Sequence, residues 1–330
     1  MHSGGYTADP RIRWPEWLPW IVALAGFFLL PEYLSLGARI LIYILFALSL
    51  DLILGYAGII TLGHSAFFGL GAYTAGILGA KAGIADPFVQ LFLSGTAAAI
   101  LGLATGVIIL RTRALTLLML TLAITSIVLE IANKASGLTG GADGLAGVAV
   151  APILGAFKFD LFGKTAFLYC LALLFIGWLA VRRLIYSPFG AMLTGMRENT
   201  ARMHAVGAPV YRRLVLVYTI SAALAGVAGA LLTQINQFVG LNVLGFEPSG
   251  ELLVMLILGG VGRLYGAFVG PVVYLVAQDA LAKQFPEYWY FGIGLLLVLV
   301  VLFARGGILG LIDQCLSLWK PKGSARASAR

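Results

Sequence analysis

Long and nearly uncharged apolar runs dominate this chain, and they restrict it to a membrane environment. Ten such segments lie at 17–35, 38–56, 60–80, 88–110, 114–133, 164–182, 212–234, 246–262, 264–282 and 287–304. A helix of about 20 apolar residues crosses a bilayer, so each segment predicts one membrane helix. The runs are continuous rather than alternating, which excludes a transmembrane β-barrel. We therefore expect an all-α, polytopic integral membrane bundle of about ten segments.

Composition agrees with that class. The 330 residues are 60% hydrophobic and 11% charged, whereas soluble domains carry about 25% charged residues. This deficit excludes an ordinary soluble enzyme, because too little polar surface remains to face water.

Basic residues cluster between the segments and predict the orientation. Arg111 and Arg113 share one short loop, six arginines lie between Arg182 and Arg213, and further basic residues end the chain. Basic loops stay on the cytoplasmic side. Even numbers of spans separate the three clusters, so both termini are expected to be cytoplasmic.

This topology divides the chain into three parts. They are a cytoplasmic N-terminal segment (1–16), a transmembrane domain (17–304) with an inner loop (183–211) and an outer loop (134–163), and a basic cytoplasmic tail (305–330). Segment 246–262 is the weakest span, because its strictly apolar part is too short to cross a bilayer alone. A re-entrant segment is the alternative there.

A glycine-rich stretch runs from Leu54 to Tyr73. Small residues allow helices to approach closely in lipid, and glycine also permits a broken helix that lines a polar pathway. Both interpretations stay open. His64 lies inside this stretch, and an ionisable group within the membrane is a functional candidate. A hydrogen-bonded structural histidine is the alternative.

A second glycine-rich stretch, Gly259 to Gly270, echoes the first. Its spacing Gly262-xxx-Gly266-xxx-Gly270 predicts a tight helix crossing. Leu258-Gly259-x-x-Gly262 matches Leu54-Gly55-x-x-Gly58, which is compatible with an internal parallel repeat. The outer loop carries the glycines and Asp143 of Leu138–Leu145, which predict tight turns.

The inner loop predicts a short helix among its arginines. Ser187 and Pro188 have the pattern of an N-cap and a first helical residue, and a short helix is expected over Arg197–Val206. Within it, Glu198 and Arg202 have the spacing of a favourable pair. Gly207 and Pro209 should end the helix. This element either docks a partner or rests on anionic lipid headgroups.

The sequence carries no catalytic signature. Gly163-Lys164-Thr165 lacks the upstream glycine of a phosphate-binding loop, and neither a zinc-ligand spacing nor a nucleophile-elbow motif is present. We therefore expect no catalytic residue, no metal and no cofactor bound by this chain.

Four motifs in order resemble one transporter family. They are Leu54–Tyr73, Thr139–Leu145, Arg197–Gly207 and Leu258–Gly266. Together they resemble the LivM-type permease subunits of branched-chain amino acid ABC importers, over about residues 35–312. Ile59-Ile60-Thr61 departs from the more polar run of that family. The resemblance therefore leaves open whether the solute is a branched-chain amino acid or a related urea, amide or organic acid.

The resemblance implies partners. A homologous LivH-type permease would share the translocation pathway, and a periplasmic binding protein would deliver the solute. Two cytoplasmic ABC ATPases would use ATP and Mg, so this chain itself would be no enzyme. The location implied is the bacterial inner membrane.

The resemblance also implies site residues. The loop that couples permease to ATPase would comprise Arg197, Glu198, Asn199, Arg202, Ala205 and Gly207. The candidate pathway or gate residues are Tyr56, Gly58, Gly63, His64, Ser65, Phe67, Gly69, Gly259 and Gly262. The alternative is a self-sufficient secondary transporter or channel, for which paired acidic residues at mid-membrane would be expected.

Overall fold

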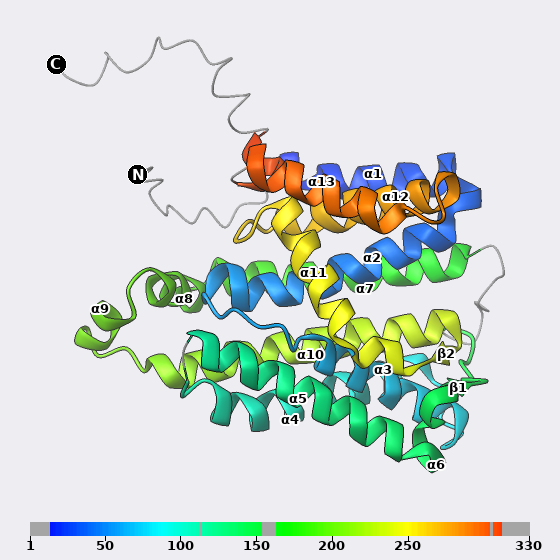
Figure 1. The fold of residues 1–330 in the computed structure, drawn as a ribbon, viewed down its shortest axis with the longest axis horizontal. Helices are drawn as coiled ribbons and strands as arrows, with labels where there is room; N and C mark the ends of the chain where they lie inside the picture. Colours follow the sequence, from blue (N-terminus) through cyan, green and yellow to red (C-terminus); the bar gives the residue numbers. More distant parts are fainter. Residues whose placement is uncertain (1–13, 113, 154–162, 304–305, 312–330) are drawn as a thin grey trace, which may run out of the picture.

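The chain folds into a bundle of helices that run roughly along one axis (Figure 1). A computed structural model describes residues 14–112, 114–153, 163–303 and 306–311. Most of the predicted N-terminal segment and most of the basic tail lie outside these described residues, as do Arg113, Lys158 and Cys315.

The described helices cover the predicted segments. They are α1 (Leu18–Leu29), α2 (Leu34–Asp51), α3 (Ser65–Ala80), α4 (Pro87–Ile109), α5 (Ala114–Lys134), α6 (Ser136–Thr139), α7 (Lys164–Ile185), α8 (Pro188–Glu198), α9 (Thr200–Ala205), α10 (Val210–Asn236), α11 (Phe246–Gly259), α12 (Gly266–Gln284) and α13 (Trp289–Phe303). Two short strands, β1 (Leu145–Ala146) and β2 (Phe238–Val239), pair in antiparallel register with Leu145 opposite Val239.

Five described helical stretches are long and apolar enough to cross a membrane. They are Pro31–Tyr56, Pro87–Ile109, Leu115–Lys134, Lys164–Ile185 and Val210–Asn236. The chain is therefore an all-α membrane protein with several spans. The 14 residues of α11 measure about 21 Å at 1.5 Å per residue, which is shorter than the roughly 30 Å hydrocarbon core.

Small residues allow the helices at the centre of the bundle to pack closely. Helix α10 packs between α3 and α4, and a side chain on Gly71 of α3 would place its Cβ 2.1 Å from the carbonyl oxygen of Gly226 on α10. A Cβ added to Gly226 would in turn lie 2.4 Å from the Cβ of Ala98 on α4. Close approach of this kind replaces the hydrophobic driving force that helices lack in lipid.

Beside the group formed by α3, α4 and α10, a second layer of helices packs around α2. Gly177 of α7 faces Leu45 of α2, with 2.5 Å from an added Cβ to the leucine methyl carbon. Trp20 of α1 packs edge-on against Trp178 of α7 and Phe268 of α12, at centroid distances of 5.4 and 5.8 Å. These aromatic contacts fix the first helix on the outside of the layer.

Hydrogen-bonded side chains join the helices at the end that carries β1 and β2. The fully buried amide nitrogen of Gln234 donates to the carbonyl oxygen of Pro87 (2.9 Å) and to Oε1 of Gln90 (3.0 Å). The hydroxyl of Tyr169 donates to Oε1 of Gln234 (3.1 Å). Helices α4, α7 and α10 are therefore held in one arrangement, because buried amides are costly unless they are paired.

The outer-loop motif forms the tight turns that its glycines predict. Gly140, Gly141 and Gly144 have φ values of 79°, 59° and 74°. A Cβ on Gly140 would lie 1.9 Å from the carbonyl oxygen of Gly144. The pairing of β1 with β2 beside this turn was not predicted.

The start of one predicted helix was wrong. The sequence places a helix over 60–80, but α3 begins at Ser65. Residues 57–64 are instead a connecting segment, because Gly58 leaves the helix with φ 73° and the amide of Gly63 bonds to the Thr61 hydroxyl (3.1 Å). The membrane region thus contains a break that hydropathy alone does not reveal.

Candidate functional site

The first helix break follows α2. After Asp51 the helix widens into a π-turn over Leu52–Tyr56. Gly58 then ends it with a positive φ, a conformation that glycine adopts without strain. A helix end leaves carbonyl oxygens without partners inside the helix, so Gly55 offers its carbonyl to another element.

The second break joins α11 to α12. Gly260 and Gly262 have φ values of 115° and 76°. A Cβ on Gly259 would lie 1.9 Å from the carbonyl oxygen of Gly266. The crossing expected from Gly266 and Gly270 is present between α11 and α12, whereas Gly262 lies in the turn rather than on the helix.

The two breaks touch one another. The amide of Gly262 donates to Oδ1 of Asp51 (2.7 Å), and the Asp51 side chain is buried. A Cβ on Gly55 would lie 2.6 Å from the amide nitrogen of Gly262. The end of α2 is therefore fastened to the α11–α12 turn by a hydrogen bond from backbone to side chain.

An arginine from the basic loop completes the contact. Arg197, in the last turn of α8, donates from Nη1 to the carbonyl oxygen of Gly55. A Cβ on Gly262 would lie 2.8 Å from the same nitrogen, and one on Gly58 would lie 3.0 Å from Arg197 Cγ.

We call Asp51, Gly55, Gly58, Arg197 and Gly262 the junction. It joins three of the four sequence motifs, and two of its contacts link residues 142 and 211 positions apart. A cation at the end of a helix is favourable, because the free carbonyl groups there carry partial negative charge.

The basic loop differs from its prediction in one important way. The helix expected over Arg197–Val206 is broken at Asn199, whose side chain accepts from the amide of Arg202 (2.9 Å) and caps α9. Glu198 and Arg202 therefore lie on different helices, and the expected pairing between them was wrong.

The ends of the loop helices were predicted more closely. Pro188 begins α8 as expected, but the Ser187 hydroxyl donates to the Leu184 carbonyl (2.6 Å) instead of capping the helix. Gly207, with φ 85°, follows α9 as the predicted terminating glycine.

The loop helices project from one end of the bundle (Figure 1). No residue of α9 is buried, and Val206 is 79% exposed. Of the six predicted coupling residues, Arg197 lies at the junction. All six are exposed, including Arg197, and the other five are Glu198, Asn199, Arg202, Ala205 and Gly207. A cavity of about 640 Å³ lies beside Arg197 and is also lined by Gly58 and His204.

His64 lies in a buried packing network. Its Nε2 is 2.8 Å from the Ser49 hydroxyl, and its ring stacks on Phe46 at a centroid distance of 5.5 Å. The Ser49 hydroxyl also donates to the Phe46 carbonyl (2.6 Å). Ser221 of α10 donates to the Ser49 carbonyl. The histidine thus joins the break to α2 and, through Ser49, to α10.

The remaining pathway candidates divide by burial. Gly58 is exposed and Gly262 half-buried. The others are buried at helix contacts, namely Tyr56, Gly63, His64, Ser65, Phe67, Gly69 and Gly259. For example, the amide of Ser65 donates to the Ser249 hydroxyl (2.8 Å), and a Cβ on Gly69 would lie 2.3 Å from Leu244.

Sequence reasoning missed Asp51 as a site residue. It lies near the end of a predicted span and has no acidic partner in the sequence. The signal that could have identified Asp51 is its place as an ionisable residue inside an apolar run, four positions before Gly55 of the Leu54–Tyr73 stretch.

The junction links α8, the end of α2 and the α11–α12 turn through hydrogen bonds. Arg197 bonds to Gly55 directly, and Asp51 of the same helix end bonds to Gly262 in the α11–α12 turn. The geometry can therefore transmit movement of the basic loop to two breaks in the membrane helices.

Comparison with known proteins gives a consistent family. The family model described as branched-chain amino acid transport system / permease component matches residues 33–301. LivM, a high-affinity branched-chain amino acid transport system permease protein of Salmonella typhimurium, is 27% identical over 90% of this chain and 75% of its own length. LivM of Escherichia coli is 27% identical over 84% of this chain and 70% of its own length.

A second kind of permease is also similar. LivH of Salmonella typhimurium is 30% identical over 41% of this chain and 44% of its own length. No solved structure matches the chain. Likeness to both LivM and LivH implies a pair of permeases.

Proposed function

Because this chain belongs to the family of permease components of branched-chain amino acid transport systems, we propose that it forms half of the translocation pathway of an ATP-driven importer. A homologous LivH-type permease forms the other half. A periplasmic binding protein delivers the solute, which is a branched-chain amino acid or a related small polar or organic acid. The complex resides in the bacterial inner membrane.

The observation that carries this proposal is the junction. An importer of this kind hydrolyses ATP in a separate subunit, so it needs an element that carries force from the cytoplasm into the membrane. Helices α8 and α9 project beyond the bundle, and Arg197 connects them to two helix breaks. We assign ATPase coupling to this loop, 183–211.

Charge supports the orientation. The junction lies at the end of the bundle where arginines gather. There Arg111 lies over the Tyr211 ring (5.9 Å), Arg182 pairs with Glu16 (3.0 Å) and Arg213 lies over Phe189 (5.5 Å). Basic residues stay on the cytoplasmic side. We therefore place this arginine-rich end, the segment 1–16 and the tail 305–330 in the cytoplasm.

The remaining proposals complete the topology. The ten predicted segments form the transmembrane permease domain, 17–304, with the loop 134–163 on the outer side. This chain binds no cofactor and is no enzyme, because ATP and Mg are used by the two ABC ATPases. The glycine-rich stretches at 55–71 and 259–270, which contain the two helix breaks, form the pathway or its gate.

Isolation of the intact assembly tests the proposal. The tagged chain is purified in mild detergent from its native host, and its companions are identified by mass spectrometry. We expect a second permease and one or two ATPases. If the chain is recovered alone while a control ABC complex survives the same detergent, and if it then takes up solute without ATP, the proposal is wrong.

A further inference from the structure

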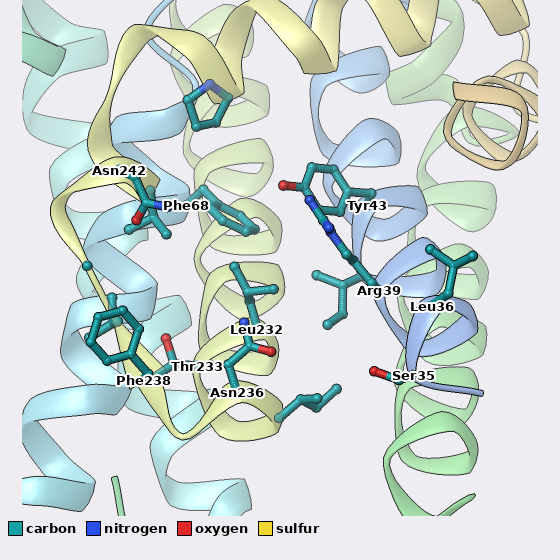
Figure 2. Close-up of a pocket in the computed structure, with 16 residues that line it drawn as sticks. Ser35, Leu36, Arg39, Tyr43, Phe68, Leu232, Thr233, Asn236, Phe238 and Asn242 are labelled. Carbon is teal, nitrogen blue, oxygen red and sulfur yellow. The ribbon is translucent and has the colours of Figure 1, made fainter. Parts of the chain in front are cut away.

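A cavity lined by both polar and apolar side chains lies at the end of the bundle opposite the junction. It has a volume of about 530 Å³, and helix α2, helix α10 and the segment from Phe238 to Pro248 line it. Figure 2 shows Arg39 and Tyr43 on one wall and Asn242 on the other, with Leu232 and Asn236 between them. Arg39 precedes Asp51 by twelve residues on α2, which corresponds to about 18 Å along the helix.

Arg39 is the unusual feature of this cavity. Its side chain is exposed although it lies in a stretch apolar enough to span a membrane. Its guanidinium carbon lies 5.7 Å from the centre of the Tyr43 ring, and it interacts at longer range with Glu251. Within the described part of the chain, no carboxylate lies within ion-pairing distance of it. An arginine in this setting is costly and calls for an anionic partner.

The rest of the wall suits a small amphipathic molecule. A guanidinium presents parallel N–H groups that match the two oxygens of a carboxylate. The amides of Asn236 and Asn242 can both donate and accept hydrogen bonds, while Phe68, Leu232 and Val243 offer apolar surface. The volume lies within the range of small-molecule sites.

We propose that this cavity is a solute site whose ligands carry a carboxylate, with Arg39 as the group that binds it. The assignment of the ligand as the transported solute rests on the proposed function, because an importer receives solute at the end opposite its ATPases. Among the solutes left open by the family, Arg39 favours amino acids and organic acids over urea and neutral amides.

Charge-selective labelling tests the cavity without depending on transport. Asn242→Cys is introduced into the full chain after Cys170 and Cys315 are replaced by alanine, and the protein is labelled in native membranes. Its rates with an anionic and a cationic methanethiosulfonate reagent are compared. We expect the anionic reagent to react several-fold faster, and Arg39→Gln to abolish that preference. Equal preferences with and without Arg39 would overturn the site.

Competition identifies the ligand chemistry in the same preparation. We expect 4-methylpentanoate to slow the labelling of Asn242→Cys, and 4-methylpentanamide, which has the same shape without the charge, to have no such effect. Inorganic phosphate is the third probe, since a lipid headgroup would present a phosphate. Protection by phosphate but not by the carboxylate would overturn the assignment to a solute.

Uptake of labelled L-leucine by cells of the native host provides the functional readout. Arg39→Gln should lower uptake by about ten- to a hundredfold, the effect of losing a hydrogen bond to a charged group. Arg39→Lys should keep the labelling preference but not the uptake. The matched control is Lys134→Gln, which removes an exposed positive charge from the last residue of α5, next to α6. It should leave both measurements unchanged.

The labelling and uptake experiments distinguish a failure of the cavity proposal from a failure of the proposed function. If the wild-type chain supports no leucine uptake while the labelling preference depends on Arg39, the proposed solute fails and the cavity remains a carboxylate site. If leucine uptake is normal in Arg39→Gln, the cavity is not the solute site, whereas the proposed importer function is unaffected.

Discussion

The amide of Gly262 donates a 2.7 Å hydrogen bond to the buried carboxylate of Asp51, which lies 211 residues earlier in the chain. This bond fastens the α11–α12 turn to the end of α2. Arg197 reaches the same point from the basic loop through the Gly55 carbonyl. Three distant parts of the chain are therefore joined by hydrogen bonds at this position.

Asp51→Ala should destabilise the protein, because it leaves the Gly262 amide without its partner. An unsatisfied buried donor costs about 1–3 kcal/mol, and the free energy of unfolding should fall by that amount. Asp51→Asn should cost less, because it keeps an accepting oxygen. Thermal unfolding of the purified chain in detergent measures both. The matched control is Asp279→Ala, which breaks a more exposed pair with Lys283 (2.6 Å). If Asp51→Ala unfolds at the same temperature as this control, the Asp51–Gly262 bond does not contribute to the stability of the protein.

Gly71→Ala should disrupt the contact of α3 with α10. The added Cβ would lie 2.1 Å from the Gly226 carbonyl oxygen, so one helix must shift. Overpacking of this kind costs about 1–3 kcal/mol. Gly26→Ala is the control, since an added Cβ meets nothing within 4 Å on α1. Unfolding temperatures of the two variants are compared, and equal values would show that the close approach is not required.

Glu16→Ala should loosen the attachment of the first helix. Glu16 pairs with Arg182 at 3.0 Å, and their side chains are only 13% and 7% exposed. Removal of one partner from a buried pair costs about 3 kcal/mol, because the other charge stays buried. Glu130→Ala breaks a pair with Lys134 that is 3.4 Å long and largely exposed. It should have little effect on the unfolding temperature. The prediction fails if the two variants are equally stable.

Hydropathy and turn residues predict much of this fold from the sequence. A helix lies over each of the ten predicted segments, because apolar length decides where a helix forms in lipid. Gly207 ends α9 and the Thr139–Leu145 motif turns tightly, because these glycines occupy backbone conformations that other residues rarely adopt.

Other features depend on contacts that no local pattern encodes. The start of α3 at Ser65 follows from the turn at Gly58 and from contact of the connecting segment with α5, where the Leu62 amide donates to the Thr121 hydroxyl (3.4 Å). The break at Asn199 competes with a helical pattern that continues through it, and a capping asparagine was the available signal. The junction and the cavity around Arg39 join residues far apart in the chain. The sequence therefore identifies Gly58, Arg197 and Gly262 as separate candidates without showing that they meet.

The ratio of ATP hydrolysed to solute imported tests the central claim most directly. The permease pair, its ATPases and the binding protein are reconstituted in vesicles with Arg197→Gln, and with Arg212→Gln as a control that removes an exposed arginine of the same basic end. If Arg197 transmits force to the two helix breaks, Arg197→Gln should keep ATP hydrolysis and lose about tenfold in import, while Arg212→Gln should match wild type. A ratio for Arg197→Gln equal to that of wild type would contradict the account.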